Sequence, residues 1–425
     1  MLLESARRMR SLASVACAVV LAFPPGAGAG QPTKGGAGRL STAQAEALVR
    51  EMSATVERLR RLRFKTPVAV EVVDGATARK DFESQLDDAE REEARHTRDA
   101  WVHLGLVPAG TDLVAAHLDT AEKDVVGYYQ SRSKTFRLLS HVSDLELRSV
   151  MAHELTHALE DQHYDLAAVQ KRATNADHAV AIRAVIEGSA MVTTLSILHR
   201  QGGIGKAKEE AALSSQKRAK SVEGAPTFVQ MQLLLPYTLG FSFLFRGKPW
   251  ELLFDGVRIE DIEQAYSEPP HSTREILHPE QYWGGRRRNA RLLALPDLSA
   301  VLGKGWSRVV AGSIGELGLT LLTGSQLKSG GFEMLLPTSW ATPGASGTAG
   351  DVYHHYVDGD RTLTVLLTRW ESVRDADEFQ RNLRGGRKTV FRFGANLFML
   401  MGDFGEKGEA LAAEAARSVK YWAGE

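Results

Sequence analysis

Two histidines stand four residues apart, with a glutamate directly after the first, in the segment RSVMAHELTHALEDQHYDL, residues 148–166. On a helix with about 100° per residue, His153 and His157 lie about 40° apart and one turn along the axis, so both imidazoles can reach one ion. The apolar side chains of the segment cluster on roughly the opposite side and would pack inward. The spacing therefore predicts a metal-binding helix rather than a charged helix face in water.

Glu154 flanks this ligand face and cannot easily share the same ion. The position suits a general base that acts on water activated by the metal. Neutral imidazoles together with a carboxylate are ligands typical of Zn²⁺, and a catalytic zinc keeps a fourth position open for water or substrate. We therefore expect Zn²⁺ as the cofactor and Glu154 as the catalytic base.

Two side chains compete for the third ligand position, and the first is His163, six residues after His157. This is the spacing of metzincins, which need a glycine at position 160 to break the helix and turn the last histidine toward the ion. Position 160 is a glutamate, which is a good helix former. On a continuous helix His163 would point about 100° away from the midpoint of the other two histidines.

The second candidate is Glu187, in the segment RAVIEGSAMV on a helix predicted over about 176–200. A carboxylate in an otherwise apolar stretch is costly to bury without a partner, and a metal ion is such a partner. Gly188 and Ala190 beside it would let the two helices approach closely. The alternative for Glu187 is an ion pair with Arg183, one turn earlier. We predict that Glu187 is the third ligand.

The N-terminus has the order of a secretory signal peptide. Arg7, Arg8 and Arg10 precede the apolar run SLASVACAVVLAF, and the small residues of PPGAGAG follow. We therefore predict a signal peptide over residues 1–29 and a protein that is secreted or periplasmic. Cys17 is the only cysteine and lies within this apolar run, so the mature chain has neither a disulfide framework nor a catalytic thiol.

The composition excludes several partners. Lys+Arg and Asp+Glu both number 52, so no net charge attracts nucleic acid or anionic lipid. After the signal peptide, the stretch that comes closest to a membrane span is FVQMQLLLPYTLGFSFLF (228–245), but it contains Gln, Pro and Gly. We interpret it as a buried pair of helices. The mature chain is expected to cross no membrane and to meet a peptide or protein substrate.

A chain of 425 residues is long enough for two domains. Periodicity predicts, for the first domain over residues 41–290, a helix over 41–63, a strand over 66–73, a polar helix over about 77–104, two strands within 124–140 and a loop over 267–283. The two strands are joined by a Ser-Arg-Ser-Lys turn. The second strand leads into the helix with the two histidines.

The C-terminal part, residues 300–425, is predicted to be a small α+β domain. DVYHHYVDG, RTLTVLLTRWE and KTVFRFGANLFMLMGDF have the pattern of strands, while VRDADEFQRNL and KGEALAAEAARSVKYW have that of helices. His354 and His355 are neighbours on a predicted strand, so they face opposite sides and cannot share one ion. We expect both to be structural.

His153-Glu154-x-x-His157, followed by Glu187 on the next helix, resembles the gluzincin group of zinc metallopeptidases. More closely, the chain is similar to a largely uncharacterised bacterial family of secreted zinc metalloproteases. The matching segments are VVGYYQSRSKTFRLLSH, HELTHALEDQHYDL, AIRAVIEGSA, PPHSTREILHPEQY and DVYHHYVDGDRTLTVLLTRWESVRDADEF. The resemblance implies an α+β fold with a zincin-like, mostly helical peptidase domain, a small β-hairpin and edge sheet, and peptide hydrolysis.

The resemblance also implies that the segment ILHPEQY lies near the metal, which makes His278 the preferred donor to the oxyanion. His271, Tyr282 and Tyr128 are the other candidates, and His278 has the alternative role of capping the turn at Pro279. The segment GYYQ would form an edge strand along which an extended peptide pairs.

The chain departs from the family pattern at three positions. Met191 stands where better-studied gluzincins often have an acid that orients a histidine, and Asp161 is a weaker substitute for that acid. Family members commonly have Gln at the position of Glu160. Arg274 stands where we expect an acid. None of these three positions is a predicted ligand.

These features together predict an exported zinc-dependent metallopeptidase that uses zinc-activated water and Glu154 as general base. One alternative is a zinc-binding interaction protein without catalytic activity, although an inactive relative would have no need of Glu154. The other is a metallohydrolase that acts on a non-peptide amide or ester, such as cell-wall material.

Export is directly testable. We expect the mature chain to begin near Gly30 and to lack Cys17, because the small residues after the apolar run form a cleavage site. N-terminal sequencing of the protein from the native envelope fraction measures this. A mature N-terminus at Met1 would contradict the prediction.

Overall fold

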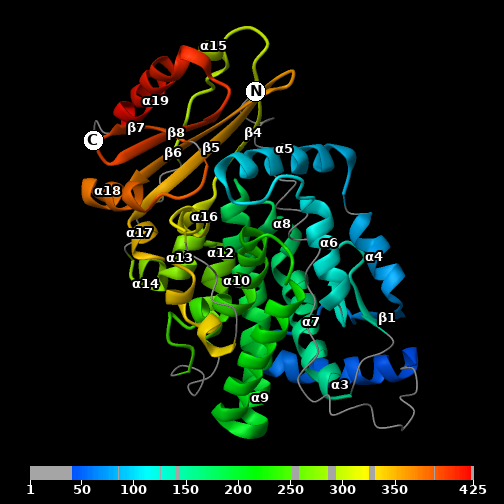
Figure 1. Ribbon diagram of the computed structural model, residues 1–425. Coiled ribbons are helices and arrows are strands. Elements are labelled where there is room, and N and C mark those ends of the chain that lie inside the picture. Colours follow the sequence, from blue (N-terminus) through cyan, green and yellow to red (C-terminus); the bar gives the residue numbers. More distant parts are fainter. Residues whose placement is uncertain are drawn as a thin grey trace.

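The computed structural model describes residues 41–84, 86–124, 126–139, 144–250, 258–285, 293–324, 331–386 and 388–422. The predicted signal peptide lies outside the described residues. The described chain is a mixed α+β structure, mostly helical, with two small sheets (Figure 1). The fold class predicted from the sequence is confirmed at this level.

The N-terminal elements include the three strands of the smaller sheet. They are α3 (Thr42–Arg60), β1 (Ala69–Val73), α4 (Gly75–Glu83), α5 (Asp88–Leu104), α6 (Leu113–Asp124), β2 (Gly127–Gln130) and β3 (Thr135–Leu139). The single helix expected over 77–104 is wrong, because Asp87 starts a new helix. Its side chain accepts a hydrogen bond from the Glu90 N–H while the Glu90 side chain accepts one from the Asp87 N–H, which is a capping box.

The predicted hairpin is confirmed. Strands β2 and β3 are antiparallel and are joined through residues 131–134. Strand β1 pairs in parallel with the other side of β3, which gives the order β1-β3-β2. Strand β2 is therefore an edge strand of this sheet, and it contacts the next helix, α7 (Asp144–Tyr164).

Helix α7 contains His153 and His157 and is followed by α8 (Leu166–Gln170) and by the long helix α9 (Ala176–Ser221). Gly202 and Gly203 have non-helical dihedral angles, so α9 consists of two helical segments. The helix predicted over about 176–200 corresponds to the first segment. Asn175 caps it by accepting a hydrogen bond from the His178 N–H.

The second segment of α9 folds back beside the first. Arg218 follows Glu187 by 31 residues, so a straight helix would separate them by about 46 Å. The guanidinium carbon of Arg218 nevertheless lies 3.5 Å from the centre of the Tyr237 ring, and its charge acts on His153 in α7. The glycine pair thus reverses the chain direction and returns Arg218 to the level of the two histidines.

Helix α10 (Thr227–Leu244) is one continuous buried helix with Pro236 inside it. The expected pair of helices over 228–245 is therefore wrong. A proline removes one intrahelical hydrogen bond, yet here sixteen of the eighteen helical residues are buried by neighbouring elements, and this packing keeps the helix in one piece.

Helices α9 and α10 touch through their backbones. A Cβ atom added to Gly240 would lie well inside 3.0 Å of the carbonyl oxygen of Ala184, and one added to Gly188 would overlap the backbone of Gly240. The prediction that Gly188 permits two helices to approach closely is therefore confirmed. The partner, however, is α10 rather than the histidine helix α7.

The remaining elements form short helices and the larger sheet. They are α12 (Ile259–Ser267), α13 (Thr273–Leu277), α14 (Pro279–Trp283), α15 (Ser299–Leu302), β4 (Ser307–Gly312), α16 (Gly315–Leu322), η1 (Gly331–Leu335), η2 (Pro337–Ser339), α17 (Pro343–Ser346), β5 (Thr348–Asp358), β6 (Arg361–Trp370), α18 (Val373–Asn382), β7 (Thr389–Phe393), β8 (Asn396–Gly402), η3 (Gly405–Lys407) and α19 (Gly408–Trp422). The segment over 267–283, predicted as a loop or short turns, contains α13 and α14.

The larger sheet has the order β4-β5-β6-β8-β7 and is antiparallel throughout. Helices α5 and α18 pack on one face and α19 on the other (Figure 1). The strands and helices predicted for this part are confirmed, while β4 was not predicted. His354 contacts the Tyr356 hydroxyl and His355 contacts Thr364, so the two histidines lie on opposite faces as expected.

Among the described residues, one helix is long and apolar enough to cross a membrane by length and composition alone. This helix is α9, and 94% of its most apolar stretch is buried inside the protein. The expectation that residues 228–245 come closest to a span is therefore wrong. A helix that is surrounded by other elements of the core has the same composition as a membrane helix.

The backbone contact between α9 and α10 makes a stability prediction. Gly240→Ala should lower the free energy of unfolding by about 1–3 kcal/mol or more, because the new methyl group must push two helices apart. Gly205→Ala is the matched control: it lies in α9 with no atom within 4 Å of the added methyl group, so it should raise stability by up to about 1 kcal/mol. Urea titrations measure both variants, and equal stabilities would contradict the prediction.

Candidate metal centre

Helices α7 and α9 bring His153, His157 and Glu187 together, and we refer to these three residues as the triad. One ligand atom from each lies within 4.8 Å of the others, and all three side chains are fully buried. The Nε2 atoms of His153 and His157 lie 3.1 and 3.4 Å from the same atom, Oε2 of Glu187. The i and i+4 positions on α7 thus face one carboxylate from the first segment of α9.

The chemistry of the triad fits a metal ion. Burial lowers the pKa of His153 to about 4, which favours the neutral imidazole that a metal needs. Burial alone would raise the pKa of Glu187, but the two imidazoles outweigh it and lower the pKa to about 2. Among the described residues, Nδ1 of His157 and Oε1 of Glu187 have no hydrogen-bond partner. Buried polar atoms without partners are expensive, and an ion would stabilise this arrangement.

Glu154 lies beside the triad and is fastened to the edge strand. Its Oε2 atom accepts a hydrogen bond of 2.8 Å from the backbone N–H of Tyr129 in β2. Its Oε1 atom is buried and has no hydrogen-bond partner in the described part of the chain. Burial and then the nearby charge of Glu187 raise the pKa of Glu154 well above its ordinary value. One oxygen is therefore held in place, and the other remains able to exchange a proton.

His163, the alternative ligand, lies elsewhere. Its Nε2 atom is 2.8 Å from the carbonyl oxygen of Arg63, just after α3. Helix α7 runs without a break to Tyr164, so the helical rotation carries His163 away from His153 and His157. The group of possible ligands found among the described residues contains Glu187 and not His163.

Glu160, at the position where a metzincin needs glycine, ties α7 to three other helices. It accepts hydrogen bonds from Arg60 of α3 (2.5 Å), from the Tyr266 hydroxyl of α12 (2.6 Å) and from the Ser189 hydroxyl of α9. Arg60 and Glu160 are both fully buried, and a buried charge needs such pairing to be tolerated. Because Ser189 is two residues from Glu187, this contact sets the register of α9 against α7.

Asp161 does not take the role of orienting a histidine. Its carboxylate instead accepts hydrogen bonds from the Tyr129 hydroxyl (2.9 Å), Lys134 Nζ (2.6 Å) and the Leu166 N–H (3.1 Å). Asp161 and Glu154 thus hold the same residue of β2, one through its side chain and the other through its backbone. The acid one turn beyond His157 fixes the edge strand rather than the ligands.

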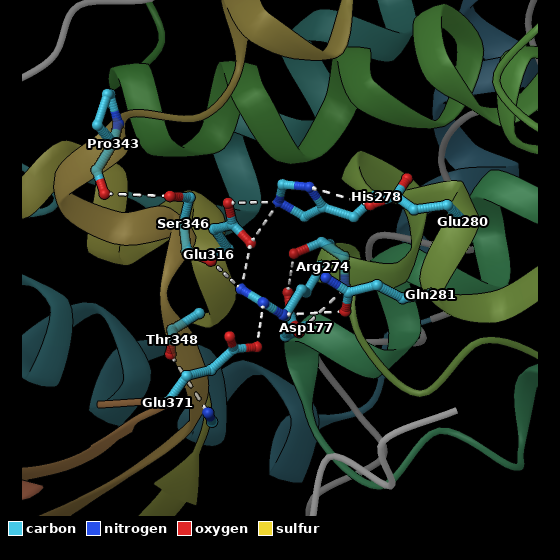
Figure 2. A network of polar contacts seen from close by, with 12 residues as sticks. Asp177, Arg274, His278, Glu280, Gln281, Glu316, Pro343, Ser346, Thr348 and Glu371 are labelled. Carbon is cyan, nitrogen blue, oxygen red and sulfur yellow. Dashed lines mark hydrogen bonds and ion pairs between the residues drawn. The ribbon is translucent and has the colours of Figure 1, made fainter. Parts of the chain in front are cut away.

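The four residues considered as oxyanion donors belong to other polar contacts. His278 Nε2 lies 2.9 Å from Oε1 of Glu316, within the network drawn in Figure 2. The Tyr128 hydroxyl donates to Asp81, and the Tyr282 hydroxyl donates to the Glu268 carbonyl oxygen at 2.7 Å. The His271 ring packs against the His178 ring. His278, the preferred candidate, thus has a carboxylate partner of its own.

Arg274 lies at the centre of the same network, where the family pattern predicted an acid (Figure 2). Its guanidinium lies 3.4 Å from Glu316 in α16 and 2.8 Å from Glu371, and it donates to the Ser346 carbonyl oxygen at the end of α17. These partners all belong to the C-terminal part of the chain. Arg274 therefore fastens α13 to that part, and an acid there would repel both glutamates.

Two residues that the sequence analysis did not identify lie next to the triad. The Tyr237 ring of α10 stacks on the His153 ring with centroids 6.2 Å apart. The guanidinium carbon of Arg218 lies 3.5 Å from the centre of the Tyr237 ring, and its charge acts on both His153 and Glu154. Burial and the charge of Glu187 raise the pKa of Tyr237 well above its ordinary value, so its hydroxyl stays protonated. The signal in the sequence for Tyr237 was a phenol group in the apolar run LLLPYTLG.

Comparison with known proteins identifies one region. Residues 305–394 match a domain of unknown function (DUF8575). No curated protein and no solved structure matches the chain. The matched region begins just before β4 and ends just after β7, so it includes neither α7 nor α9. The likeness therefore concerns the larger sheet and does not touch the triad.

The two candidates for the third ligand can be separated by metal content. Glu187→Ala leaves only two imidazoles to bind zinc. Loss of a residue that merely hydrogen-bonds a ligand lowers metal affinity roughly 10- to 100-fold, so loss of a ligand itself should lower zinc affinity by more than that. His163→Ala is the matched control and should retain about one zinc per chain. Mass spectrometry after dialysis measures both. Zinc lost from His163→Ala but kept by Glu187→Ala would reverse the assignment.

Proposed function

We propose that the protein is an exported, zinc-dependent metallopeptidase with a zincin-like catalytic core. The observation that carries this proposal is the convergence of two imidazoles and one carboxylate at a buried point, with Glu154, also buried, close enough for its charge to interact with that of Glu187. Structural zinc sites use four protein ligands, whereas catalytic sites use three and leave a position open. The triad matches the catalytic set.

His153, His157 and Glu187 would hold the ion. When bound, zinc supplies the Lewis acid that lowers the pKa of water and polarises a substrate carbonyl. Zinc is favoured over the hard cations Mg²⁺ and Ca²⁺, because two of the three donors are imidazole nitrogens. The other roles belong to side chains and backbone groups of the chain itself.

Glu154 acts as the general base and then as the general acid. Its Oε1 atom accepts the proton of the attacking water and later delivers a proton to the leaving amine. The hydrogen bond from the Tyr129 N–H to Oε2 holds the carboxylate in place. A positioned acid or base of this kind contributes about 10²–10⁴-fold to the rate.

The outer edge of β2 is suited to an extended peptide. The Val126 carbonyl oxygen accepts a hydrogen bond from the Leu139 N–H, so alternation along the antiparallel pair turns the backbone groups of Gly127 and Tyr129 away from β3. The Tyr129 N–H is already donated to Glu154, so a substrate strand would pair with the Gly127 groups and the Tyr129 carbonyl oxygen, and it would pass beside Glu154. This geometry supports a peptide substrate rather than a small ester.

Tyr237 and Arg218 are the best candidates for stabilising the oxyanion. The Tyr237 hydroxyl stays protonated, and the Arg218 guanidinium supplies a permanent positive charge next to the Tyr237 ring. Donors of this type are most effective in a site without water, and both side chains are buried. They replace His278 in this role, because the His278 imidazole contacts Glu316.

The base is tested by Glu154→Gln. The variant should keep about one zinc per chain, because the three ligands remain, and should lose about 10²–10⁴-fold in kcat, because proton transfer is lost. Glu46→Gln, on the exposed side of α3, is the control and should leave both unchanged. Turnover is measured on a peptide library and, in parallel, on cell-wall fragments.

Equal turnover of Glu154→Gln and the natural chain would remove Glu154 from the mechanism. Turnover of wall fragments alone would favour the non-peptide hydrolase. A chain that binds zinc but hydrolyses neither library would favour the interaction protein.

A further inference from the structure

The candidate site is closed to substrate in this structure. Glu154 and the three side chains of the triad have no exposed surface, while Tyr237 and Arg218 are 2% and 3% exposed. A reacting carbonyl group must come within hydrogen-bond reach of the base, about 3 Å. A peptide cannot come that close unless one wall of the site moves.

The second segment of α9, residues 204–221, forms one of these walls, and we call it the arm. The arm carries Arg218 onto the Tyr237 ring. It begins after Gly202 and Gly203, where the helix is interrupted, and it is followed by Gly224, which has a φ of 97°. Both ends therefore have backbone that can change direction at low cost.

The arm is attached less firmly than the helix from which it extends. The first segment of α9 is buried at every position from Asp177 to Ser196. The arm has only five buried positions: Ala207, Ala211, Ser214, Ser215 and Arg218. Alanine and serine bury little apolar area, so separating this face costs less than separating a face of leucines. Local opening favours elements with little buried apolar contact.

The other walls are fixed more strongly. Strand β2 is held to α7 by Tyr129, which donates hydrogen bonds to Glu154 and Asp161. Helix α7 is held by the buried pair Arg60 and Glu160, and α10 by backbone contact at Gly240. A cleft of about 940 Å³ lies at the end of the arm, where Ser221 and residues 222–227 face the side of α6. Among the described walls, the arm is the one that can yield.

We propose that the arm is a gate: it swings away from α10 about Gly202 and Gly203 to admit substrate, and on closing it returns Arg218 to the reaction centre. The identity of the substrate rests on the proposed peptidase function, whereas the motion is a property of the fold. Closing would both exclude water and complete the set of donors around the oxyanion. Arg218 would thus be present only when the site is shut.

Hydrogen exchange on the full chain tests the motion without any substrate. Amides of residues 204–221 should exchange at least about a hundredfold faster than those of residues 184–196, and as one cooperative group. Equal protection in the two segments would overturn the gate. This measurement needs no metal and no activity, so it decides the gate even if the peptidase proposal fails.

A cross-link tests whether this motion controls access. Lys208 in the arm has its Nζ atom 5.5 Å from the centre of the Trp250 ring, which follows α10, and neither residue is part of the proposed machinery. In a Cys17→Ser background, Lys208→Cys and Trp250→Cys can be joined by a short bis-maleimide. The joined protein should lose bound zinc to a chelator at least about tenfold more slowly than the Lys208→Cys variant treated in the same way.

Equal rates of zinc loss in the joined and control proteins would show that the arm does not gate the site. A chain that binds no zinc would refute the proposed function, and the hydrogen-exchange result would then decide the gate alone.

Discussion

The buried carboxylate of Glu187 is the interaction on which the arrangement of the helices depends. An ionised acid in the middle of an apolar helix is tolerated only when groups of suitable charge or hydrogen-bonding capacity surround it. His153 and His157 meet it from α7, which requires α7 and α9 to be in contact at this level. The pair Arg60 and Glu160 fixes the same contact one turn further along α7 through Ser189. The helical core is thus organised around charges rather than around apolar packing alone.

Helix α10 forms a third side of the site, and two glycines determine how closely it packs against α9. The absence of side chains at Gly188 and Gly240 lets the backbones of α9 and α10 touch. This contact places Tyr237 against His153, and the reversal at Gly202 and Gly203 brings Arg218 over Tyr237. A site assembled in this way is shielded from solvent, so its electrostatic interactions are strong. The same closure implies that catalysis would require a moving wall.

The C-terminal sheet is joined to the helical part by charge and by a common apolar core. Trp101 of α5 and Tyr353 of β5 belong to one buried cluster, and Arg274 pairs with glutamates of the C-terminal part. The likeness to a domain of unknown function falls on this sheet and leaves the triad outside it. The resemblance implies that His278 lies near the proposed metal site, and the structure shows its imidazole in contact with Glu316, in the network that joins the two parts. The resemblance gave no indication of this partner, which lies 38 residues further along the chain.

Local geometry determined what could be predicted. The i and i+4 spacing of His153 and His157, the missing glycine at Glu160 and the lone acid Glu187 are properties of single helices, so the sequence alone brought these residues into one hypothesis. The strands and helices of the C-terminal part followed from periodicity in the same way. Tertiary structure decided the rest. Arg218 and Tyr237 follow His153 and His157 by 61 to 84 positions, and no spacing rule relates residues so far apart. The continuity of α10 through Pro236 likewise depends on the packing around that helix. Contacts between residues far apart in sequence leave no periodic signal, because they are set by how whole helices cross.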